Sequence, residues 1–132
     1  MSWKMHFHEF ETVSALTAPE RYSYFIKKVC DWKSLWGLKG SAGWALGRSE
    51  DGRDYIPVWP HEQFARACAT EAWAGYEPVF IELSSWLQRW IPGMLQDKKN
   101  AAVFMTPANT GVSVMPDRLQ ADLEAELSKY EE

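Results

Sequence analysis

The sequence predicts an α+β fold: one small antiparallel or mixed sheet of about five or six strands, with helices packed on it. Short apolar segments bounded by glycine and proline alternate with amphipathic helical patterns, and turn signals join several of these segments. The 132 residues, of which 46% are hydrophobic and 14% aromatic, fit a single domain over residues 1–132. Residues 17–130 are expected to form its compact core, and residues 1–16 a poorly ordered terminus or a short leading helix.

The clearest helix is expected over residues 18–32. Thr17 can cap the first turn, Pro19 suits an early helical position, and Glu20 completes a capping-box pattern. The apolar residues that follow recur at the spacing of one helical face, and they are Tyr22, Phe25, Ile26, Val29 and Cys30. This segment is therefore predicted to pack on the sheet through that face.

The segments expected as strands are residues 35–38, 44–48, 55–59, 78–83, 101–106 and 112–115. A tight-turn signal at residues 50–52 predicts that the second and third of these pair as an antiparallel hairpin. Trp44 and Trp59 could then be cross-strand neighbours. Pro57 has no amide hydrogen, which predicts an edge strand, or a bulge where that donor is not needed.

Three more helices are expected, at residues 60–68, at residues 86–95 and from Pro116 onward. Pro60 opens the first of them. Pro92 and the glycine after it predict a break or kink near Ile91 in the second. The last helix carries a narrow leucine stripe under a strongly acidic face.

Composition argues against several classes of function. Residues 117–132 hold six acidic residues against two basic ones, which accounts for the whole net charge of −4, and basic residues are too sparse elsewhere for nucleic-acid binding. No apolar run approaches the roughly 20 residues of a membrane span, and no signal peptide is recognisable. A cytoplasmic protein is therefore expected, with Cys30 and Cys68 as reduced core thiols. The glycines match no nucleotide-binding pattern, so we expect no cofactor.

Catalytic and metal sites find little support in the spacing of the residues. Cys68 and His61 lie seven residues apart on one predicted helix, about 10 Å along its axis, which is too far for direct proton transfer. A pair of Cys30 with His61 stays open, because the sequence does not fix their separation. His6 and His8 could share a metal, yet no third ligand has suitable spacing. We expect no catalytic residues and no metal.

An anion site is a further possibility at the start of the helix at 60–68. His61 would lie at the helix N-terminus, where free amides and the helix dipole can hold an anion. Arg48 and Arg53 on the neighbouring hairpin could add positive charge. Alternatively, both arginines pair with acidic residues of the hairpin in a surface cluster that contributes little to stability. These acids are Glu50, Asp51 and Asp54.

The chain contains eight tryptophans, more than a core of this size requires. Three of them fit core positions: Trp36, Trp86 and Trp90. The others of interest, Trp44, Trp59 and Trp73, could line an exposed groove, and aromatic residues are enriched where proteins bind partners.

These patterns favour a non-enzymatic cytoplasmic binding protein. Its aromatic surface around Trp44, Trp59 and Trp73 would contact a protein partner or a second copy in a homodimer. The alternative is a protein or small enzyme that binds an anion or carboxylate in a pocket near Arg48, His61 and Cys68.

Several unusual motifs are similar to those of a known family. They include Glu20-Arg-Tyr, Trp36-Gly-Leu, Pro57-Val-Trp-Pro-His, Trp73-Ala-Gly-Tyr-Glu-Pro and Trp90-Ile-Pro-Gly. With them the chain resembles the bacterial domain-of-unknown-function family 2750 over roughly residues 18–127. The resemblance implies a small, single-domain cytoplasmic protein, and it implies no catalytic residue that could be transferred to this chain.

Overall fold

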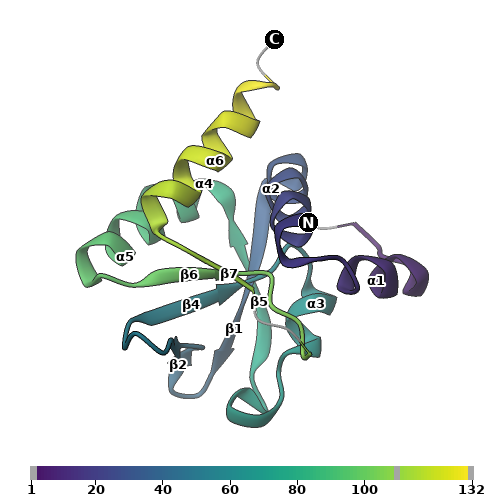
Figure 1. The fold of residues 1–132 in the computed structure, drawn as a ribbon, viewed down its shortest axis with the longest axis horizontal. Helices are drawn as coiled ribbons and strands as arrows, with labels where there is room; N and C mark the ends of the chain where they lie inside the picture. Colours follow the sequence, from purple (N-terminus) through teal and green to yellow (C-terminus); the bar gives the residue numbers. More distant parts are fainter. Residues whose placement is uncertain (1–2, 109–110, 131–132) are drawn as a thin grey trace.

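The computed structural model describes residues 3–108 and 111–130, and Figure 1 shows its strands at the centre with helices around them. The helices are α1 (Phe7–Ser14), α2 (Ala18–Trp32), α3 (Glu62–Ala67), α4 (Leu83–Ser85), α5 (Ile91–Asp97) and α6 (Pro116–Ser128), with a 3₁₀ turn η1 (Glu71–Trp73) and a π turn η2 (Trp86–Trp90). The strands are β1 (Ser34–Gly40), β2 (Gly43–Trp44), β3 (Gly47–Arg48), β4 (Asp54–Val58), β5 (Glu77–Glu82), β6 (Asn100–Val103) and β7 (Val112–Val114). The predicted α+β class is confirmed.

The strands form two sheets rather than one. The first has the order β2-β1-β5 and the second the order β3-β4-β6-β7. Only β4 and β6 run parallel among the named pairs, so the pairing is mixed. One bridge joins the sheets, because the backbones of Trp36 and Trp59 exchange two hydrogen bonds of 2.8 and 2.9 Å. This bridge sets β1 beside β4.

The segment predicted as one strand over residues 44–48 is divided between the two sheets. Trp44 in β2 lies opposite Lys39 of β1, whereas β3 pairs with β4. Trp59 lies opposite Trp36. Trp44 and Trp59 are therefore not cross-strand neighbours, because the chain leaves the first sheet between β2 and β3.

Pro57 lies in β4, which is a central strand of its sheet, so the edge-strand prediction is wrong. The backbone N–H that proline lacks is nevertheless not needed at this position. The Trp59 backbone bonds toward β1, and the Val58 carbonyl accepts from Phe104 N–H on the side of β6. Backbone groups alternate in direction along a strand, so those of Pro57 point toward β1. Strand β3 pairs with β4 only at Asp54 and Tyr55, so at Pro57 no neighbouring strand needs a backbone N–H from β4.

Helix α2 begins and ends where the sequence predicts. Thr17 Oγ1 accepts from the Glu20 amide at 3.3 Å, and Glu20 Oε1 accepts from the Thr17 amide at 3.0 Å, which completes the capping box. Arg21 in its first turn is buried, and its Nε donates to the Phe104 carbonyl at 3.0 Å. This contact ties the start of α2 to the end of β6.

The helix after β5 passes through Pro92 without ending. The Ile91 amide donates to the Trp86 carbonyl, one residue further back than in an α-helix, which creates the π turn η2. Pro92 has no N–H to donate, and the wider turn lets the helix continue past it without that hydrogen bond. The predicted interruption near Ile91 takes this form.

None of the helices in the described part of the chain combines the length and the hydropathy that a membrane span requires.

The N-terminal segment forms a helix and packs on the core. Met5 and Val13 are buried, and Phe10 of α1 stacks on Phe64 of α3 with ring centroids 5.2 Å apart. Of the two expectations for residues 1–16, the structure shows the short leading helix. Residues 1–2 lie outside the described part.

Two tryptophans without exposed surface differ in how their indole groups are satisfied. Trp59 Nε1 donates to the Met105 carbonyl at 2.9 Å. Trp86 Nε1 is buried and has no hydrogen-bond acceptor among the described residues. Trp59 therefore holds the segment after β6, whereas Trp86 only fills space.

This difference gives a matched pair of substitutions. Trp59→Phe and Trp86→Phe remove the same atoms from fully buried sites, so their comparison isolates the indole hydrogen bond. We expect Trp59→Phe to lower the free energy of unfolding by about 1–2 kcal/mol more than Trp86→Phe, measured by urea denaturation. Equal losses in the two variants would contradict a holding role for the Trp59 indole.

Candidate functional site

The main candidate site is a pocket of about 320 Å³ that we call the Trp73 pocket. The β3–β4 hairpin, the end of α3, the turn η1 and the segment after β6 contribute to it. Its walls are Leu46, Gly47, Tyr55, Cys68, Thr70, Glu71, Ala72, Trp73, Met105, Thr106 and Pro107. It therefore brings together two sequence-predicted residues, Cys68 and Trp73.

Trp73 is held in place by contacts on two sides. Its indole N–H donates to the Leu46 carbonyl at 3.4 Å, and its ring lies edge-on to Trp59 with centroids 6.4 Å apart. The Met105 carbonyl, which accepts from Trp59, also accepts from the Cys68 thiol at 3.4 Å. The buried Trp59 thus supports two residues of the pocket lining, Trp73 and Met105.

Glu71 is the charged residue in the lining of the pocket. It begins the turn η1 with a backbone φ of 55°, a left-handed conformation that non-glycine residues rarely adopt. Among the described residues, the lining contains no lysine, arginine or histidine. The one charged side chain that we find in this lining is therefore a carboxylate, which favours a cation over an anion.

The thiol of Cys68 is not prepared for nucleophilic attack. Burial raises its pKa to about 11, and the hydrogen-bonding influence of Trp59 opposes this rise only in part. No described hydrogen bond joins Cys68 to His61. Because the thiolate is the nucleophile and the thiol is protonated at neutral pH, Cys68 contributes packing and a weak donor.

Cys30 is equally inert. It has no exposed surface, and its thiol donates to the Leu123 carbonyl at 3.5 Å. Burial is the main cause that raises its pKa to about 11, with a smaller contribution from the Glu126 carboxylate. Both cysteines are free, as expected for core thiols.

His61 has a structural role. It is 3% exposed, and its Nδ1 accepts from the Gln63 amide at 3.1 Å, so it caps α3 with its own side chain. Because Nδ1 is the acceptor, Nε2 carries the hydrogen and donates to the Trp3 carbonyl. The ring therefore fixes the N-terminal segment to α3 and leaves no ring nitrogen for a substrate.

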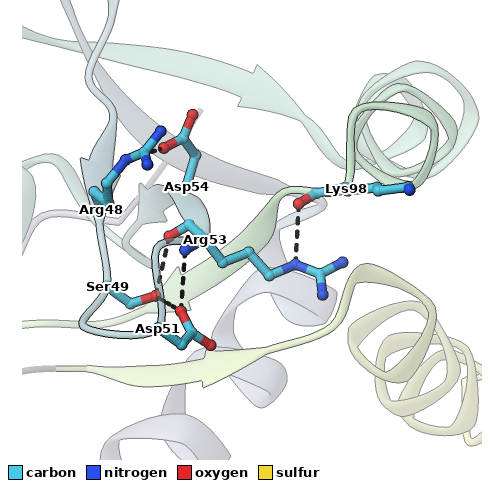
Figure 2. A network of polar contacts seen from close by, with 6 residues as sticks. All are labelled: Arg48, Ser49, Asp51, Arg53, Asp54 and Lys98. Carbon is cyan, nitrogen blue, oxygen red and sulfur yellow. Dashed lines mark hydrogen bonds and ion pairs between the residues drawn. The ribbon is translucent and has the colours of Figure 1, made fainter.

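The arginines predicted beside His61 belong to a separate surface network, shown in Figure 2. Arg48 Nε pairs with Asp54 at 3.1 Å, and Arg53 Nε donates to the Lys98 carbonyl at 3.0 Å. Asp51 accepts from Ser49 Oγ and from the Arg53 amide, which closes the hairpin turn. The hydrogen bond from Ser49 is the main cause that holds the Asp51 pKa below its usual value.

This network corresponds to the alternative of a surface charge cluster. No described hydrogen bond or ion pair links Arg48 or Arg53 to His61 or Cys68. Arg48 and Cys68 line different pockets, and His61 lines neither of the two. Exposed ion pairs such as that of Arg48 contribute little to stability.

The three tryptophans of the predicted aromatic surface do not form one patch. Trp59 has no exposed surface, because its backbone bridges the sheets and its ring fills the core, so it cannot contact a partner. Trp44 is half-buried and packs over Gly37 and against Trp90, with ring centroids 4.7 Å apart. Only Trp73 of this set lines the pocket.

Glu71 and Tyr55 are site residues that the sequence did not single out. A left-handed glutamate has no signature in a single sequence, and the region 71–77 looks like an ordinary connection. Among residues 3–108 and 111–130, no group of three histidine, cysteine or carboxylate side chains could hold a metal.

A family model described as "Protein of unknown function (DUF2750)" matches residues 22–123 of the chain. The matched range extends from α2 into α6 and includes every strand and the whole Trp73 pocket. No curated protein matches the chain.

The raised thiol pKa values predict how stability depends on pH. Well below pH 9 the thiols are protonated in both the folded and the unfolded chain, so their contribution to stability is complete. Between pH 9 and about 11 the unfolded chain loses thiol protons that the folded chain keeps, so stability falls. We expect this to cost about 1–3 kcal/mol per thiol.

A variant with Cys30→Ala and Cys68→Ala isolates this effect, since Tyr22 and Tyr24 also have raised pKa values. Its free energy of unfolding should fall less between pH 9 and 11 than that of the wild type, measured by urea denaturation at each pH. Parallel losses in both proteins would contradict the assignment to the thiols.

Proposed function

The chain belongs to the DUF2750 family, and we propose that it is a non-enzymatic protein that binds a small organic cation, such as a primary ammonium, in the Trp73 pocket. The observation that carries this proposal is the pairing of an aromatic wall, Trp73, with one carboxylate, Glu71, in a pocket whose described lining residues include no basic one.

The size and lining of the pocket support a small ligand. Ligand sites commonly have volumes of roughly 300–1,000 Å³ and combine apolar walls with a few polar groups. The Trp73 pocket, at about 320 Å³, lies at the lower end of this range. Leu46, Trp73 and Met105 supply apolar walls, while the hydroxyl groups of Tyr55 and Thr70 supply polar contacts.

The sign of the charge supports a cation. An ammonium group is attracted by the face of an indole ring and by a carboxylate. The Glu71 carboxylate would repel the anion or carboxylate that the sequence suggested. A positively charged ligand with an apolar body is thus the class that matches both features of the pocket.

The chemistry of the pocket supports binding without turnover. Catalysis by a cysteine requires a thiolate and a neighbouring base, and Cys68 has a raised pKa and a carbonyl as its hydrogen-bond partner. The buried free thiols also support a reducing, cytoplasmic location in a bacterium, which remains part of this proposal.

Two probes of similar shape and opposite charge test the proposal. We expect benzylammonium to bind with a dissociation constant of about 0.1–10 mM in isothermal titration calorimetry, as a ligand of this size allows, whereas benzoate gives no saturable binding. Trp73→Leu should abolish the benzylammonium signal. Benzoate binding at the affinity of benzylammonium, or unchanged binding by Trp73→Leu, would contradict the proposal.

A second variant pair separates binding from backbone strain. Glu71 and Lys98 both adopt left-handed conformations, with φ of 55° and 58°, and asparagine tolerates this region better than either residue. Glu71→Asn should keep or raise the melting temperature yet weaken benzylammonium binding about three- to fivefold. Lys98→Asn is the matched control and should leave binding unchanged. Equal affinities in the two variants would count against Glu71.

A further inference from the structure

Strand β5 has a free edge. It pairs with β1 along its whole length, from Glu77 opposite Lys39 to Glu82 opposite Ser34. It is the last strand of its sheet, and no other described strand pairs with it. A free edge of this kind presents backbone groups on which another strand can form hydrogen bonds.

The direction of these backbone groups follows from the bonds on either side of β1. The Leu83 amide donates to the Lys33 carbonyl, so the odd-numbered residues of β5 bond toward β1. On its opposite side, β1 bonds through even-numbered residues, since Trp36 pairs with Trp59. The even-numbered residues of β5 therefore direct their backbone groups outward.

The outward groups form a short and defined set. Phe80 and Glu82 each present an N–H, whereas Pro78 has none. Pro78 and Phe80 each present a carbonyl. The Glu82 carbonyl is different, because Glu82 is the N-cap of the helix that starts at Leu83 and its carbonyl accepts the first bond of that helix. Each edge thus offers two donors and two acceptors.

We propose that β5 binds β5 of a second copy of this chain, antiparallel and about a two-fold axis at Phe80. The Phe80 residues of the two copies exchange two hydrogen bonds, and each Glu82 N–H donates to the Pro78 carbonyl of the other copy. All the outward donors and acceptors are then satisfied. The missing N–H of Pro78 faces the Glu82 carbonyl that the helix already uses, so the edge is self-complementary.

Pro78 also selects this register. Sliding the second copy by two residues in either direction would leave a Phe80 or Glu82 donor without a strand acceptor. Self-pairing is therefore restricted to one arrangement, which closes into a dimer and does not extend into a fibre.

The side chains beside the edge favour the same partner. Phe80 is 37% exposed and lies edge-on to Trp36, so two Phe80 rings would meet as a cross-strand aromatic pair. An apolar pocket of about 500 Å³ adjoins it, with Trp32, Leu83, Leu87 and Leu127 in its walls. Pairing would remove part of this apolar surface from water.

No like charges meet in this register. The two Glu82 carboxylates are separated by four residues along the strands, roughly 14 Å, which is beyond the screening length at physiological salt. Each Glu82 lies opposite Pro78 of the other copy, so no acid faces an acid. Glu77, which pairs with Arg66 at 3.3 Å, points to the other face of the strand, because side chains alternate along it.

Substitution of Glu82 tests the backbone bond directly. Glu82 has a φ of −69°, close to the value of about −65° that proline requires, and its N–H does not bond to β1. Glu82→Pro therefore removes the outward donor without disturbing the protomer. The matched control, Glu82→Gln, removes the charge and keeps the donor.

Sedimentation equilibrium measures the outcome. The wild type should form a dimer, with a dissociation constant of about 10–500 μM as expected for a small interface. Glu82→Pro should weaken it at least about tenfold, because two hydrogen bonds per dimer are lost, and Glu82→Gln by less than about threefold. Thermal melts of the three proteins establish that the protomers are folded.

Three results would overturn the proposal: a wild type that stays monomeric at about 1 mM, a Glu82→Pro dimer of wild-type affinity, or equal weakening by Glu82→Pro and Glu82→Gln. Self-pairing does not depend on the Trp73 pocket, which uses other residues. The Glu82 variants should bind benzylammonium as the wild type does, so the two proposals can fail separately.

Discussion

The backbone bridge between Trp36 and Trp59 is the contact on which the rest of the structure depends. It joins the two sheets where neither β2 nor β3 does, since these short strands each belong to one sheet. The Trp59 ring then anchors Met105 and supports Trp73, while the next residues lead into α3 through the His61 cap. One position thus sets the sheet junction, the wall of the Trp73 pocket and the entry to a helix.

Placing Trp59 at this junction explains why residues with reactive side chains have structural roles. His61 is used to start α3 and to hold the N-terminal segment. Cys68 donates to the Met105 carbonyl that also accepts from Trp59. Two features take no part in this junction: the turn at Glu71, with its left-handed backbone, and the free edge of β5. The proposals for ligand binding and self-association concern these two features.

The sequence predicts the elements well where local interactions decide them. Helix α2 follows from its capping box and apolar stripe. Sequence reasoning fails where tertiary context decides. It cannot show that the chain passes from the first sheet to the second after Trp44. Nor can it show that Pro57 lies in a central strand beyond the end of β3, or that a π turn accommodates Pro92.

The candidate site follows the same rule. Trp73 and Cys68 could be named from composition and pattern, because aromatic residues and thiols attract attention in any sequence. Glu71 could not, since its importance comes from a left-handed backbone conformation and from the absence of basic residues among the described residues of the pocket lining. The grouping of Arg48 with His61 assumed a shared site, whereas the described contacts of Arg48 and Arg53 are with Asp54 and with the Lys98 carbonyl.

The central claim is that the Trp36–Trp59 bridge holds the two sheets together. Native-state hydrogen exchange of the two bridging amides tests it most directly. Both should exchange only through global unfolding, with an opening free energy equal to the free energy of unfolding and the same dependence on denaturant. Exchange of either amide through a local opening, while the amides between β1 and β5 and between β4 and β6 stay protected, would contradict the claim.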